Sequence, residues 1–432
     1  MGWYSDSNEK VLCTIVQDHV DKDYVCIIMG RDRVGRYRAV HLSDWFNTIG
    51  RARAAMTELL PEWAAKPPSE YEQGDEPSRA IDLLAPLHPA ERLNPFFVKL
   101  IQQEAFSPAR GIIEAMMYYF KDPDGNFVEQ FQSSAFDARI WELYLFALLA
   151  ELRYGIDRTH PAPDYLCEGL AGSFFIEAVT VGPTVRDGRS VETAKPHNEA
   201  ELRRYMTHYL PIKFAGPLTK KLSRRYWEQA HIGRRPIVLA IADFHYPMSI
   251  TWSQTGLVTY LYGYAHKWHH DDQGKLVIDP ERIQEHSWGA KTVPSGFFNL
   301  PDSEHISAVI SSRAATISKF NRMGLKAGFG SPRVRMIRKG KRYVDDPNRA
   351  EPEDFVVAVH EPKYEESWAE GLEVYHNPLA ANPIDPEMLP GGTHHFLKNG
   401  QVITYCCGSQ TFGSLTFISL EGQGNGVAIE EM

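Results

Sequence analysis

Three carboxylates lie in sequence surroundings where an ionised side chain needs a partner. Glu142 falls within an apolar segment, Asp164 follows a proline, and Glu177 lies in the run Phe-Phe-Ile-Glu-Ala-Val. Charged groups seldom occupy such runs unless another charge or a metal ion compensates them. Hard divalent cations prefer carboxylate oxygens as ligands. These acids are therefore candidate ligands for Mg²⁺ or Mn²⁺, and such a site can polarise a phosphoryl oxygen and activate water.

The spacing of the acids indicates how they could meet. Asp164 begins one β-like run, and Glu177 lies thirteen residues later on the next, beyond the turn sequence Gly-Leu-Ala-Gly at 169–172. A tight turn places two strands side by side, so the two carboxylates are expected to face each other. Glu142 would approach from the helix that precedes this hairpin.

The elements that must position these acids follow one another in a simple order. Residues 134–154 are apolar on most sides and predict a buried helix. Residues 164–168 and 173–181 predict a hairpin. Residues 199–228 predict a basic helix that is broken at a proline, and 236–242 predict a central buried strand. Helix, hairpin, helix and strand together predict an α/β fold with a mixed sheet.

This arrangement resembles the PD-(D/E)XK nuclease superfamily. The resemblance rests on Pro163-Asp164, the hairpin, Glu177-Ala178-Val179, and the helix sequence Phe-Asp-Ala-Arg-Ile-Trp-Glu at 136–142, and it covers about residues 134–245. It implies a restriction-endonuclease-like core in which Glu142, Asp164 and Glu177 hold Mg²⁺ or Mn²⁺. It also implies that water attacks a phosphodiester, with DNA as the substrate.

The sequence departs from the superfamily pattern at the lysine. In the superfamily pattern the lysine lies two positions after the strand acid, and this chain has Val179 at that position. In some relatives the lysine comes from the following helix, and Lys221 is the preferred replacement here, with Lys213 as the alternative. A relocated lysine implies an active enzyme. A lost lysine implies a catalytically inactive nuclease-fold protein that binds nucleic acid or a protein partner.

Each of these residues could instead serve the fold or a different chemistry. Glu142 could be the internal partner of Arg139 or Lys221. Asp164 could begin a turn, and Lys221 could be an ordinary surface lysine. A pair of carboxylates could also serve an unrelated enzyme such as a glycosidase. Convergence of the acids with a lysine beside them distinguishes the nuclease from these alternatives.

Basic residues concentrate in two segments of an acidic chain. The net charge is −9, yet residues 201–235 carry +7 and residues 331–342 carry +6. Such segments can bind a polyanion locally, and the alternative is a solvated helix face and a solvated hairpin. The candidate nucleic-acid-binding residues are Arg224, Arg225, Arg333, Arg335, Arg338 and Lys341.

The remaining sequence predicts additions around this core. We expect a β-rich N-terminal module at 1–60 with one helix beginning near Ser43, and a Pro- and acid-rich linker at 61–91. The nuclease-like core would occupy 92–250, followed by a C-terminal extension of mostly short strands at 251–432. The histidine-rich stretches at 266–270 and 394–395 are expected to be loops.

Composition excludes several classes of protein. With 432 residues, of which 43% are apolar, the chain can bury a core and is neither disordered nor fibrous. Its apolar runs are too short to span a bilayer, and no secretory signal is apparent, so we expect a cytoplasmic protein that has no membrane partner and could form a homodimer. The cysteines lack Cys-x-x-Cys spacing and predict buried free thiols: Cys13, Cys26, Cys167, Cys406 and Cys407.

Overall fold

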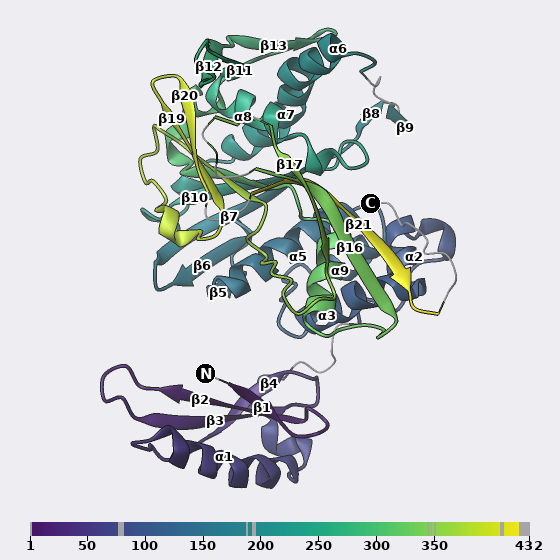
Figure 1. Ribbon diagram of the computed structural model, residues 1–432, viewed down its shortest axis with the longest axis vertical. Helices are drawn as coiled ribbons and strands as arrows, with labels where there is room; N and C mark the ends of the chain where they lie inside the picture. Colours follow the sequence, from purple (N-terminus) through teal and green to yellow (C-terminus); the bar gives the residue numbers. More distant parts are fainter. Residues whose placement is uncertain are drawn as a thin grey trace. The chain divides into compact units, whose positions relative to one another are not determined.

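The computed structural model divides the chain into two compact units (Figure 1). It describes residues 2–76, 82–186, 189–191, 196–343, 346, 348–349, 351–406 and 410–422. The first unit comprises Met1–Leu83 with Glu114–Phe120, and the second comprises Leu84–Ile113 with Lys121–Met432. No helix within the described residues is long and apolar enough to cross a membrane.

The first unit is an antiparallel sheet covered on one face by a helix. The sheet runs in the order β1-β2-β3-β4, and α1 packs on β2 and β3. Alternate residues of β2 point toward α1, which is why Val11, Cys13 and Ile15 are buried. The bounds are β1 Trp3–Ser5, β2 Val11–Gln17, β3 Tyr24–Arg31, β4 Tyr37–Leu42 and α1 Ile49–Ala64.

The β-rich character of this unit is confirmed, but its helix begins later than predicted. Thr48, not Ser43, caps α1 by accepting from the backbone N–H of Arg51, whereas the Ser43 hydroxyl caps no helix and accepts from Cys26 N–H. The predicted linker at 61–91 is also partly wrong. Its first residues complete α1, and Tyr71 is buried in the core of this unit.

The second unit is built on one mixed sheet of eight strands. Its order is β20-β19-β18-β15-β10-β7-β6-β5, with β7, β10 and β15 parallel in its centre. The central strand β10 is buried along its whole length, as its unbroken apolar run predicts. The bounds are β5 Gly155–Asp157, β6 Tyr165–Gly169, β7 Gly172–Val181, β10 Ile237–Asp243, β15 Ala308–Ser312, β18 Leu372–His376, β19 Thr393–Lys398 and β20 Gln401–Tyr405.

Helices cover both faces of this sheet. On one face α7 and α8 pack on Phe175, Leu239 and Ile241, and on the other face Trp141 of α5 donates its indole N–H to the Ala240 carbonyl at 3.1 Å (Figure 1). The helices are α2 Pro95–Gln102, α3 Ser107–Met117, α4 Phe127–Gln132, α5 Phe136–Glu151, α6 Glu199–Arg204, α7 Leu210–Leu222, α8 Gln254–Tyr262 and α9 Ile317–Lys326. The predicted order of helix, hairpin, helix and strand is thus present as α5, β6–β7, α7 and β10.

Smaller sheets complete the unit. The two-stranded ones pair β8 with β9, β11 with β12, and β13 with β14, and a three-stranded one has the order β17-β16-β21. The bounds are β8 Thr184–Arg186, β9 Arg189–Val191, β11 Tyr264–His270, β12 Leu276–Arg282, β13 Glu285–Trp288, β14 Lys291–Pro294, β16 Val334–Tyr343, β17 Glu353–Ala358 and β21 Gln410–Leu420.

Several predictions about the C-terminal half need correction. Residues 251–432 are not a separate extension, because β15, β18, β19 and β20 belong to the same sheet as β7 and β10. The histidine-rich stretches are strands rather than loops, in β11 and β19. Cross-strand pairing fixes these short polar segments, and their own sequence does not report those partners.

Three of the described cysteines are buried free thiols, as predicted. Cys13, Cys26 and Cys167 are buried, whereas Cys406 is exposed, which is contrary to expectation. Cys407 lies outside the described residues.

Candidate active site

The register of the hairpin brings Asp164 beside Glu177. Tyr165 pairs with Ile176, so the residue before Tyr165 lies next to the residue after Ile176. One carboxylate oxygen of Asp164, Oδ2, accepts from the backbone N–H of Ala178 at 2.7 Å. This bond fixes the side chain of Asp164 against the strand that carries Glu177.

The two carboxylates act on each other electrostatically. Burial, followed by the negative charge of Glu177, raises the pKa of Asp164 to about 7. Two acids this close cannot both be ionised without cost unless a cation compensates them. The Lys221 ammonium supplies one positive charge and counteracts that shift, so the two acids keep one negative charge in excess when both are ionised.

Glu177 lies on the face of β7 that α7 covers and is only 3% exposed. Its Oε1 accepts from the ammonium of Lys221 and, at 2.8 Å, from the Tyr226 hydroxyl. Its Oε2 is buried and has no hydrogen-bond partner among the residues that the structure describes. One oxygen of this carboxylate is thus held in place while the other remains available to a ligand.

Lys221 reaches this site from the last turn of α7. Val179 lies two residues beyond Glu177 on β7 and packs among apolar residues of the core beneath α7. The other candidate lysines lie elsewhere: Lys213 donates to the carbonyl of Gly182 and the hydroxyl of Thr184, and Lys220 is exposed. Of the three lysines, Lys221 is the one that contacts a predicted catalytic acid.

Glu142 is not drawn into the pair. Arg139 and Arg158 both donate to its carboxylate, Arg158 at 3.1 Å, and the Glu142 carbonyl accepts from Tyr165. Burial raises the pKa of Glu142, and the two arginines counteract that shift. Glu142, Asp164 and Glu177 do not form one ligand group, because their carboxylate oxygens do not all lie within 4.8 Å of one another, although the charge of Glu142 still raises the pKa of Asp164.

Two of the candidate nucleic-acid-binding residues flank the carboxylate pair. Arg224 and Arg225 are exposed just after α7, and Arg225 also pairs with Glu228 at 3.0 Å. Their position in the loop that carries Tyr226 places them at the edge of the site.

The second basic segment differs from the prediction. Arg338 is 3% exposed and forms ion pairs with Glu366 and Glu370, so it is not part of a surface that a polyanion could contact. The other three are paired on the β16 sheet or beside it: Arg333 with Glu104, Arg335 with Glu421 and Lys341 with Asp354. Alternation along a strand buries every second residue, and here that rule places an arginine inside.

Sequence reasoning missed two groups of residues. The first is Tyr226, which follows Arg225, but nothing in the local sequence indicates that its hydroxyl meets Glu177.

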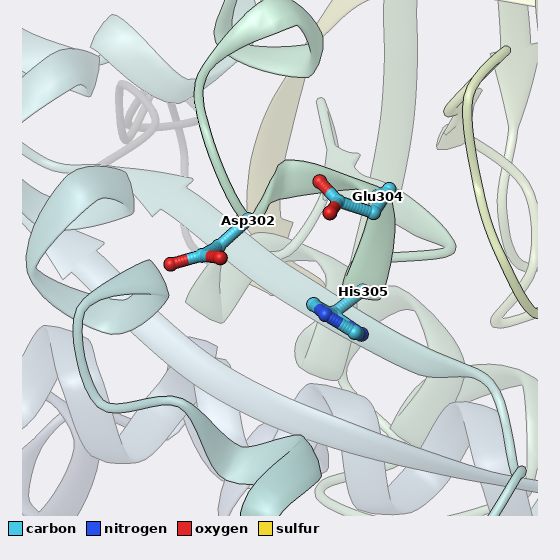
Figure 2. Close-up of side chains that lie close together, drawn as sticks. All are labelled: Asp302, Glu304 and His305. Atoms are coloured by element: carbon cyan, nitrogen blue, oxygen red, sulfur yellow. The ribbon is translucent and has the colours of Figure 1, made fainter.

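The second group is Asp302, Glu304 and His305, and no other three described residues place possible metal-ligand atoms within 4.8 Å of one another (Figure 2). All three come from one short turn, and Glu304 is exposed. Exposed acidic groups of this kind are common without an ion.

Comparisons with family models, curated proteins and solved structures find no match to this chain.

Proposed function

We propose that this protein is a metal-dependent nuclease in which Asp164 and Glu177 hold Mg²⁺ or Mn²⁺ and Lys221 assists the hydrolysis. The observation that carries the proposal is the buried, unpartnered Oε2 of Glu177 beside Asp164. A buried carboxylate oxygen without a donor is costly, and a divalent cation is the ligand that best relieves it.

The donor set suits such a cation. Glu177 Oε2 and the half-buried carboxylate of Asp164 are both oxygen ligands, and their mutual repulsion would be relieved by a cation. Binding there need not displace Lys221 or Tyr226, because both contact the other oxygen of Glu177. When bound, the metal would stabilise negative charge on the phosphoryl group and lower the pKa of a water molecule.

The residues of the chain would have distinct tasks. Tyr226 holds Glu177 in position, and burial raises the pKa of its hydroxyl, so it remains a hydrogen-bond donor at neutral pH. Lys221 would neutralise charge that develops on the phosphate. Glu142 has no role as a metal ligand in this proposal, because Arg139 and Arg158 occupy its carboxylate.

The order of elements also supports the proposal. The resemblance drawn from the sequence implies a helix, a hairpin with both acids, a basic helix and a buried strand. The chain has α5, β6–β7, α7 and β10 in this order, with β7 and β10 adjacent and parallel. DNA is the substrate class that this resemblance implies.

The proposal is tested by incubating the full chain with supercoiled DNA, linear DNA, single-stranded DNA and RNA in Mg²⁺ or Mn²⁺. We expect cleavage of at least one DNA substrate that stops when EDTA removes the metal. Failure to cleave any of these substrates in either metal would overturn the nuclease and favour a protein that binds without cutting. Cleavage that persists in EDTA would exclude the metal site.

The edge of the site should contribute to DNA binding. Arg224→Gln should reduce the slope of log Kd against log salt for a DNA duplex by up to about one unit, because one phosphate contact is lost. Arg335→Gln is the matched control, since Arg335 is paired with Glu421 on the β16 sheet. Filter binding or fluorescence anisotropy across a salt series measures both. Equal slopes for Arg224→Gln and the wild type would place the DNA elsewhere.

A further inference from the structure

A pocket lies outside the carboxyl end of the central strand β10. It is a pocket of about 40 Å³ at the end of β10, lined by Asp137 of α5, by Asp243, and by the aromatic side chains of Phe96, Phe136, Phe244 and Tyr246. One water needs roughly 10–15 Å³ by the same measure, so the pocket holds about three water-sized groups. That is room for an ammonium group and about two carbons, so a longer tail would extend out of the pocket.

The pocket occupies a favoured place in the topology. After β10 the chain continues to α8, on the same face as α7, and after β15 it continues to α9, on the side of α5 (Figure 1). In open α/β sheets ligands bind where neighbouring parallel strands send their chains to opposite faces. The carboxylate pair is separate from this place, since Glu177 pairs with Leu239, four residues before Asp243.

The charged side chains that line the pocket are carboxylates. Asp243 is buried, and His245 Nδ1 lies 2.7 Å from its Oδ1 and 2.9 Å from its Oδ2, while Tyr205 contacts His245 Nε2 at 2.9 Å. This chain of contacts holds the Asp243 carboxylate at the end of β10. Among the described residues that line the pocket none is a lysine, an arginine or a histidine.

Asp137 lacks compensation. Within the described part of the chain it has no hydrogen bond and no ion pair, and burial alone raises its pKa to about 6. It remains largely ionised at neutral pH, and the positive end of α5 favours that form. A carboxylate in this state, among aromatic rings, favours an occupant that carries a positive charge.

We propose that this pocket binds a primary alkylammonium group. The ammonium would donate to Asp137, and the aromatic rings would surround the cation and the first carbons of its tail. The carboxylate of Asp137 opposes an anion, and apolar walls disfavour a fully hydrated inorganic cation. The site is independent of the proposed nuclease reaction.

The probe is n-butylammonium chloride, added to the full chain and followed by isothermal titration and by NMR saturation transfer. We expect binding in the millimolar range or tighter. Neutral n-butanol, which has the same tail, should bind at least tenfold more weakly, because it cannot form charge-assisted hydrogen bonds. Equal binding of the two probes, or no binding of butylammonium, would overturn the proposal.

Asp137→Asn identifies the residue responsible. This variant should weaken butylammonium binding by at least tenfold, and it should melt no lower than the wild type because the amide removes an uncompensated buried charge. The matched control is Asp302→Asn in the turn of Figure 2, which should leave butylammonium affinity unchanged. An unchanged affinity in Asp137→Asn, or an equal loss in Asp302→Asn, would contradict the proposal.

Discussion

Glu177→Gln should reduce Mg²⁺-dependent cleavage of DNA by about a thousandfold or more. The substitution removes the negative charge of a carboxylate whose Oε2 is buried without a partner, and a positioned metal contributes several kcal/mol to such a reaction. Calorimetric titration with Mn²⁺ should show a parallel loss of affinity. Because the amide keeps an oxygen that can accept from Tyr226, the fold should be preserved.

The matched control is Glu168→Gln, on the partner strand of the same hairpin. Glu168 is exposed and pairs with Ser173, so this variant changes a charge near the site without touching its contacts. It should cleave and bind Mn²⁺ as the wild type does. If Glu177→Gln also cleaves at the wild-type rate, Glu177 is not a catalytic residue, and the proposed metal site is wrong.

Lys221→Met should lower the cleavage rate on the order of a hundredfold, which is the effect of removing one positioned electrostatic group. Its ammonium contacts Glu177 Oε1 from α7, and in the proposed nuclease it takes the place of the lysine that Val179 does not supply. Mn²⁺ affinity should persist, because Asp164 and Glu177 remain. A lower cleavage rate at unchanged Mn²⁺ affinity is the result expected of a lysine that assists the reaction, and it is not expected of a merely structural ion pair.

Lys220→Met provides the control for this prediction. Neighbouring residues on a helix point about 100° apart, and Lys220 is exposed where Lys221 is turned inward. Its cleavage rate should stay within about twofold of the wild type, since a solvated surface charge contributes little. Similar losses in both variants would indicate a general effect of charge on DNA binding. If Lys221→Met cleaves DNA at the wild-type rate, the hypothesis that Lys221 serves as the nuclease lysine is wrong.

Much of the fold could be predicted from local patterns. The local sequence indicates the environment of three elements. They are the apolar run of β10, the hairpin turn between β6 and β7, and the largely apolar α5. The boundaries of α1 and the strand character of 266–270 and 394–395 were missed. The Thr48 cap is a local signal, since Thr48 accepts from Arg51 N–H, and β11 and β19 each form a hairpin with the next strand, so these elements were missed because their strand residues are polar and not because their partners are distant.

The sequence by itself determined that Asp164 and Glu177 would meet. Hairpin register depends on the turn and on side-chain alternation, both of which are local properties. For the proposed nuclease it also required that the lysine come from another element, because position 179 is a valine.

Only the tertiary structure decided which side chains surround that pair. It brought Lys221 and Tyr226 to Glu177, it turned Glu142 toward Arg139 and Arg158, and it buried Arg338 among acids. The physical reason is that a charged side chain settles where the nearest opposite charge or hydrogen-bond partner lies, and those partners come from elements far apart along the chain.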